Sequence, residues 1–326
     1  MKGLRFVLVV CCAALASPVF ARQPDGVIRG GDPPAMAQGK PRLGVKLISS
    51  PDDNAPGAMI LEVMSGFAAE LSGLQNGDRV TRIGDDAIVD TDAFRDAISK
   101  MNDGDTRTFV VYRDDRQVEI PVRLTAPRPD APGQRPPTHP ALRDELLRLR
   151  ETDQAGRRQL MEGTVPEDQR QKVMEEMHET DAKNRARLKE IIAQHGFPTV
   201  SMVGEDAAGA AFLLLQHADA DPELQQKMLP VLEALAGKGE ASKGNVAYLA
   251  DRVRNAQNQP QLYATQYTGQ PQPDGTIEFR PPVVEDPANL DKRRRAMGLE
   301  PWAMYERRMA ELQGREPFEK VRGPGE

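Results

Sequence analysis

Residues 65–88 read SGFAAELSGLQNGDRVTRIGDDAI, and this stretch decides the fold of the first half of the chain. Its beginning has the pattern of a short helix, at residues 67–72. The NGD triplet that follows has the composition of a tight turn, in which Gly77 can adopt the positive φ that other residues disfavour. Residues 79–83 then alternate apolar and polar side chains, which predicts a strand with one buried face.

Short apolar or alternating runs flank this stretch on both sides. They predict further strands at residues 58–64, 108–112 and 118–124. A second helix is predicted at residues 92–101, with Thr91 as its N-cap and with three apolar residues on one face: Phe94, Ile98 and Met101. Strands and two short helices in this order indicate an α+β domain.

Residues 41–125 resemble the PDZ family, and the run GLQNGDRVTRIGD is the most specific part of that resemblance. The resemblance implies a PDZ-like β-sandwich or barrel with two helices. Members of the family bind the C-terminus of a partner, or an internal extended segment, by adding it to a sheet edge as a strand. The partner that we expect is therefore a protein or peptide C-terminus, held in the PDZ-like groove.

The family binds the terminal carboxylate in a loop with a GLGF-like motif, and the matching stretch here is Arg42-Leu43-Gly44-Val45. Consecutive backbone N–H groups in such a turn form a nest for an anion. Leu43 and Val45 would line the pocket for the terminal side chain, and Arg42 or Lys46 would add a positive charge. Only one glycine is present, which leaves open whether a free carboxylate is required. The alternative is a PDZ module used only for packing.

The chain begins with a sequence typical of a secretory signal peptide. Two basic residues precede an apolar run at residues 6–16, and Val19 and Ala21 occupy the −3 and −1 positions of a cleavage site. The apolar run is shorter than the ~20 residues that a spanning helix needs. We therefore expect removal of residues 1–21, no stable membrane insertion afterwards, and a periplasmic or secreted protein.

Both cysteines, Cys11 and Cys12, lie in this leader. Lipid attachment is disfavoured because Val9 and Val10 stand where a lipoprotein has small residues. Without the leader the chain has no cysteine, which excludes disulfides, thiolate chemistry and Cys-based zinc sites. The leader also removes two basic residues, so 41 Lys and Arg remain against 49 Asp and Glu. With this acidic balance and few aromatic residues, nucleic acid is not expected as a partner.

Composition divides the rest of the chain. Residues 22–40 form an arm rich in Gly, Pro, Ala and Gln, and residues 126–140, APRPDAPGQRPPTHP, form a proline-rich linker. Residues 141–313 have mostly helical periodicity, and residues 314–326 form a tail. The predicted fold is an α+β PDZ-like domain followed by a mainly α-helical domain.

The helix predicted at residues 173–195 carries polar residues on its apolar face. Continued at helical spacing, its apolar stripe passes through Asp181 and Asn184 and reaches His195. Polar groups on an apolar face are costly unless they have partners. These residues therefore form either a buried structural network or part of a site, and for each residue alone the structural interpretation is favoured because most buried polar groups are simply hydrogen-bonded.

Further polar candidates stand near the ends of later helices. His217 and Asp219 lie in QHADAD, Asp251 and Arg252 are adjacent in YLADR, and Gln266 lies in YATQ. Together with HGFPT, these segments are similar to an uncharacterised bacterial helical domain family. The resemblance implies a fold unit and no particular reaction.

Two functions are open from the residues. In the first, the protein is an exported interaction protein whose PDZ-like domain binds peptide segments of an envelope protein. In the second, the helical domain is a hydrolase-type enzyme and the PDZ-like domain recruits or regulates its substrate. The site of that enzyme would come from seven candidates: His195, His217, Asp219, Asp251, Arg252, Gln266 and Asp181.

The first function is favoured because the chain has no HExxH, GxSxG, P-loop or GxGxxG pattern. No cofactor is expected. No metal site is assigned, although His195, His217 and an aspartate are residue types that bind metals.

Overall fold

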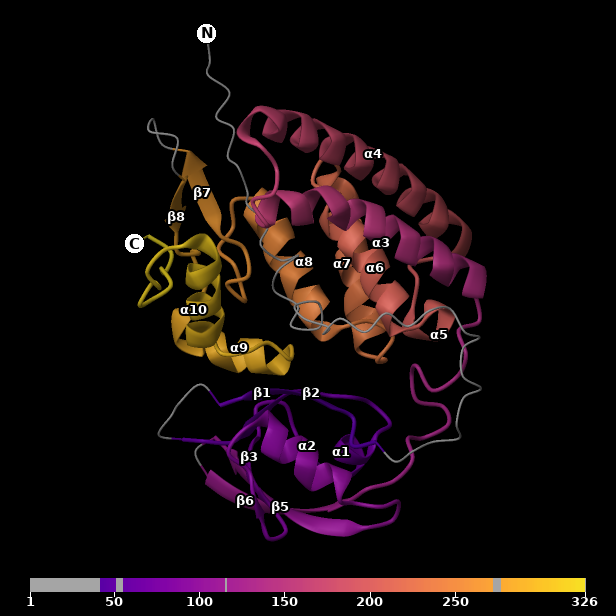
Figure 1. Ribbon diagram of the computed structural model, residues 1–326, viewed down its shortest axis with the longest axis vertical. Helices are drawn as coiled ribbons and strands as arrows, with labels where there is room; N and C mark the ends of the chain where they lie inside the picture. Colours follow the sequence, from indigo (N-terminus) through magenta and orange to yellow (C-terminus); the bar gives the residue numbers. More distant parts are fainter. Residues whose placement is uncertain (1–41, 51–54, 115, 272–276, 326) are drawn as a thin grey trace. The chain divides into compact units, whose positions relative to one another are not determined.

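The structure is a computed structural model that describes residues 42–50, 55–114, 116–271 and 277–325. The predicted leader and arm therefore lie outside the described residues. The chain divides into two units, one of residues 1–134 with 260–326 and one of residues 135–259 (Figure 1). In the described ranges, no helix combines the length and the apolar character that a membrane span requires.

An antiparallel sheet with two short helices forms the first part of the chain, as the PDZ resemblance implies. Its strands are β1 (Val45–Ser49), β2 (Ala58–Val63), β3 (Arg79–Ile83), β4 (Asp86–Ala87), β5 (Thr106–Arg113) and β6 (Arg116–Arg123). The strand order is β1-β2-β3-β5-β6, with β4 beside β3, and its helices are α1 (Ala68–Leu71) and α2 (Thr91–Ser99). The sheet is open, so β1 and β6 are its two edges.

The core of this region is apolar. Ile60, Val80 and Phe109 are fully buried on three neighbouring strands, and the Phe94 ring of α2 meets the Phe109 ring edge to face, with 6.2 Å between centroids. Such pairs add about 0.5–1.5 kcal/mol to the burial of their area. The periodicity of the sequence therefore placed the core residues on the correct face.

The NGD turn also behaves as predicted. Gly77 has a φ of 87°, which a side chain would disfavour. Asp78 is fully buried, and Arg113 donates two hydrogen bonds of 2.7 Å to its carboxylate. The Gln75 N–H donates a third, at 2.9 Å. The one charged side chain in this core is thus hydrogen-bonded on both oxygens.

The N-cap of α2 differs from the prediction. Asp90 is the cap, because its Oδ1 accepts a hydrogen bond of 2.8 Å from the N–H of Ala93. The prediction of Thr91 was wrong, since Thr91 is already helical. Its N–H donates to Ser49 Oγ at 3.2 Å, which joins the end of β1 to the beginning of α2.

Residues 260–325 contain a hairpin and two helices: β7 (Thr268–Pro271), β8 (Ile277–Arg280), α9 (Leu290–Ala296) and α10 (Trp302–Gln313). The residues expected to form a tail fold back on this segment. The Val284 N–H donates to the Arg322 carbonyl at 2.7 Å, and the Arg322 N–H donates to Pro282 at 3.1 Å. The Phe318 N–H donates to Glu306 at 2.7 Å.

Residues 135–259 are helical, which confirms the predicted fold class. The helices are α3 (Pro140–Met161), α4 (Arg170–His195), α5 (Val200–Val203), α6 (Glu205–Gln216), α7 (Pro222–Ala236) and α8 (Lys243–Ala256). The small and apolar α6 packs against α3, α4, α5 and α7, as a central helix should. Figure 1 shows α3 and α4 side by side, a pair that Gly156 brings close: a Cβ there would lie 2.7 Å from Met177 Cγ.

Candidate functional site

The predicted peptide-binding stretch leads directly into the sheet edge at β1. Among the described strands, β1 pairs only with β2. Helix α2 contacts β1, and the Ser49–Thr91 hydrogen bond fixes the two elements at one end. An unpaired strand edge presents backbone N–H and C=O groups to which an extended segment can add. This edge, with the loop before it and α2 beside it, is called the β1 edge below.

The loop before β1 is held by backbone contacts. Gly44 has a φ of 77°, and a Cβ atom there would lie 2.2 Å from Phe67 Cβ, so only glycine fits. The Leu43 carbonyl accepts from the Ala69 N–H at 2.9 Å, and the Gly44 carbonyl accepts from the Met64 N–H at 2.9 Å. The loop is therefore tied to both β2 and α1, which orients its N–H groups.

The side chains of this stretch have different positions. Leu43 is buried in the sheet core, whereas Val45 of β1 and Ile98 of α2 are only partly buried against it. Arg42 is exposed, and Lys46 forms an ion pair of 2.9 Å with Glu62. Of the predicted pocket residues, Val45 is thus open to a ligand and Leu43 supports the loop from behind.

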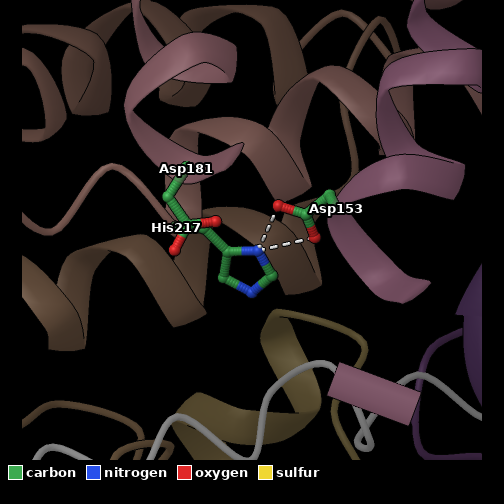
Figure 2. Close-up of side chains that lie close together, drawn as sticks. All are labelled: Asp153, Asp181 and His217. Carbon is green, nitrogen blue, oxygen red and sulfur yellow. Dashed lines mark hydrogen bonds and ion pairs between the residues drawn. The ribbon is translucent and has the colours of Figure 1, made fainter. Parts of the chain in front are cut away.

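A second polar group lies inside the helical unit. His217 is the C-cap of α6, and its Nδ1 lies 2.9 Å from each carboxylate oxygen of Asp153, on α3. Arg157, one turn along α3, lies 3.3 Å from Asp153 and donates to both oxygens of Asp181 on α4, at 2.9 and 2.8 Å. Figure 2 shows the two aspartates and the imidazole together. These four residues are called the Asp153–His217 cluster.

The cluster is largely shielded from water. Asp153 and His217 are buried, and Asp181 is half-buried. Burial raises the pKa of Asp181 above its ordinary value, and the Arg157 guanidinium acts in the opposite direction. An ionised carboxylate only accepts hydrogen bonds, so Asp153 selects the tautomer of His217 that carries its proton on Nδ1.

The structure divides the seven predicted site residues into separate places. Asp181 and His217 are brought together. Asp219 forms an ion pair with Arg252 and accepts a hydrogen bond of 3.3 Å from Gln225. Asp251 is fully buried on α8.

His195 is exposed at the end of α4, and its ring lies 5.5 Å from that of His139. Among the described residues, no hydrogen bond joins it to the other candidates. Gln266 belongs to the other unit, where its backbone and side chain bond to Gln261 and Thr265.

The segment around Gln266 is a tight polar loop. Ala264 is buried with a φ of 55°, a conformation that alanine rarely adopts. Arg294 is almost fully buried and donates to the Tyr263 and Glu300 carbonyls, at 2.5 and 2.7 Å. Arg294 therefore holds this loop in place, although it stands in the basic run at residues 292–295.

Asp153 and Arg157 on α3 were not predicted, although the sequence contained a signal for them. Leu142 and Leu146 are buried on α3, and continuing their stripe by 7 and 11 residues at helical spacing reaches Asp153 and Arg157. The same extension had identified Asp181 on α4.

Comparison with known proteins matches two parts of the chain. The model of a family described as "Family of unknown function (DUF6624)" matches residues 140–316, and a PDZ domain model matches residues 41–124. Both predicted resemblances are thereby confirmed. No curated protein matches the chain.

Among solved structures, one described as "HtrA-type protease AlgWS227A with decapeptide" is 21% identical, with a TM-score of 0.25. The match covers 28% of this chain and 31% of that chain.

Proposed function

Because the chain belongs to the family of unknown function DUF6624 and carries a PDZ domain, we propose that it is an interaction protein that binds the C-terminal or extended segment of another protein at the β1 edge. The bound segment adds as an antiparallel strand to β1. Its terminal carboxylate accepts hydrogen bonds from the loop around Gly44, and its last side chain contacts Val45 and Ile98.

The observation that carries this proposal is the position of β1 at the edge of the sheet. Among the described strands it pairs on one side only, it is preceded by a glycine turn that tolerates no side chain, and α2 contacts it. An exposed edge strand favours aggregation unless a partner strand pairs with it or another element covers it. Edge pairing supplies affinity through the backbone, and the apolar residues beside it supply specificity.

We also propose that the protein acts outside the cytoplasm, in the periplasm or after secretion. The support is the basic and apolar leader with small residues before Arg22. Expression of the full chain in a Gram-negative host and N-terminal sequencing of the protein released by osmotic shock should give a chain that begins at Arg22. Recovery of uncleaved chain from the cytoplasm alone would contradict export.

Peptide binding is tested with a library of random heptapeptides displayed with free C-termini. The sequence selected by the protein is then synthesised with a free carboxylate and with a C-terminal amide, and both are titrated by fluorescence anisotropy. We expect the free acid to bind at least ~10-fold more tightly, since charge-assisted hydrogen bonds to the carboxylate are lost in the amide. Failure to select any sequence, or equal weak binding of both peptides, would overturn the proposal.

A matched pair of variants locates the site. Val45 and Val118 are both partly buried against the sheet core, Val45 on the edge strand β1 and Val118 on the opposite edge strand β6. Val45→Asp places a negative charge beside the bound carboxylate, where like charges cost several kcal/mol, and should weaken binding by more than ~30-fold. Val118→Asp should leave affinity within about threefold. Thermal melting of both variants separates lost binding from lost folding.

A further inference from the structure

His217 has one ring nitrogen that the fold does not use. Nδ1 is engaged by Asp153, whereas no described residue bonds Nε2. Nε2 is also not among the described atoms that are both sealed from solvent and without a partner. Figure 2 shows it pointing away from Asp153 and Asp181. A carboxylate on Nδ1 leaves Nε2 as the basic nitrogen of a neutral histidine.

Arg157 argues against a metal ion at this cluster. Ligand atoms of Asp153, Asp181 and His217 lie within 4.8 Å of one another, which is close enough to share an ion. The Arg157 guanidinium, however, already contacts both carboxylates and supplies the positive charge between them. A metal ion would have to displace it.

The charged groups around His217 bear on which substrates can approach it. Asp153 and Asp181 contribute two negative charges and Arg157 one positive charge, so the cluster is negative while the imidazole is neutral. His217 also follows the last turn of α6, where unpaired carbonyl groups carry partial negative charge. An anionic substrate is therefore repelled.

We propose that residues 135–259 hold a metal-independent hydrolytic site in which His217 is the general base, Asp153 is a positioning residue, and the substrate is a neutral or cationic ester or amide. Nε2 accepts a proton from water as the water oxygen bonds to the carbonyl carbon, and the C=O electron pair moves to oxygen. The C–O or C–N bond to the leaving group then breaks as the imidazolium returns the proton to it. Ester and water give acid and alcohol, and no other reactant is needed.

Asn184 is an additional observation in favour of a ligand. It lies one helical turn after Asp181 on α4, is 4% exposed, and its amide nitrogen has no hydrogen-bond partner. A buried N–H without a partner costs about 1–3 kcal/mol. Such a donor is available to a substrate oxygen.

The test compares hydrolysis of p-nitrophenyl acetate and p-nitrophenyl phosphate by the full chain and its variants, with EDTA present. The wild type should cleave the acetate and should not cleave the phosphate. His217→Gln should lower the rate at least ~100-fold, as loss of a general base does. His178→Gln, at an exposed histidine of α4, should leave it unchanged.

If His217→Gln does not fold, Asp153→Asn tests the same proposal. It preserves the shape of the side chain but no longer fixes the tautomer, so the rate should fall and its dependence on pH should change. In the wild type, nitrogen-15 NMR should show His217 with its proton on Nδ1. Acetate cleavage that His217→Gln and Asp153→Asn leave intact, cleavage that EDTA abolishes, or a proton on Nε2 would overturn the proposal.

Discussion

The sheet region and the helical unit differ in what they bury. Among the described residues, the core of the sheet region contains one buried charged side chain, Asp78, which is fully paired. The helical unit buries seven polar or charged residues: Asp153, Asn184, Gln216, His217, Gln225, Asp251 and Arg252. The sheet region thus has an almost wholly apolar interior, whereas the polar groups inside the helical unit serve fixed networks or a site.

The largest expected effect on stability comes from breaking the Arg113–Asp78 ion pair of the sheet region. Arg113→Ala should leave the fully buried Asp78 carboxylate without its main partner and lower the free energy of unfolding by about 3 kcal/mol. Arg95→Ala, which removes an exposed partner of Asp92, should change it by less than about 0.5 kcal/mol. Urea unfolding measures both. A loss below ~1 kcal/mol for Arg113→Ala would show that Asp78 is hydrated, and would remove the contrast between the two cores.

A smaller effect is expected in the polar loop of residues 260–325. Ala264→Gly removes the cost of a positive φ at a residue with a side chain and should raise stability by roughly 0.5–1 kcal/mol. Ala310→Gly, inside α10 and equally buried, should lower it by about 1 kcal/mol. Thermal unfolding of the two variants should therefore shift in opposite directions. A shift in the same direction would mean that the Ala264 backbone is not strained.

The smallest effect concerns Asp181. Burial raises its pKa in the folded state, so its ionised form costs stability at neutral pH. The stability of the wild type relative to Asp181→Asn should be greatest below the unfolded pKa of about 3.9 and should fall as pH rises toward 7. Chemical unfolding at a series of pH values measures this difference. The opposite slope would mean that Arg157 lowers the pKa of Asp181 by more than burial raises it. The ion pair between Arg157 and Asp181 would then have a stabilising role alone.

Apolar periodicity predicted β2, β3, β5 and β6 of the sheet region, but not β1 or β4. Alternating strands placed Val80 and Phe109 in the core, and the NGD turn placed Gly77 at a positive φ. Both signals are local, because neighbouring residues decide them. Asp90 was missed as the cap of α2 because Thr91 suits that position equally well and only the backbone distinguishes them.

The cluster in the helical unit was only half predictable. The stripe on α4 identified Asp181, and QHADAD identified His217. Their partners, Arg157 for Asp181 and Asp153 for His217, come from a third helix that packing alone brings close. His195 shared the same stripe, yet it lies at the exposed end of the helix. Periodicity predicts which face of a helix is buried. It does not predict how far along that face the neighbouring helices cover it.

The most direct test of the central claim is amide hydrogen exchange of the full chain with and without the selected free-acid peptide. If the peptide adds to the β1 edge, amides of β1 and of the loop around Gly44 should become protected, and those of the other edge strand, β6, should not. Protection at β6, or unchanged exchange at β1 at saturating peptide, would contradict strand addition at this edge.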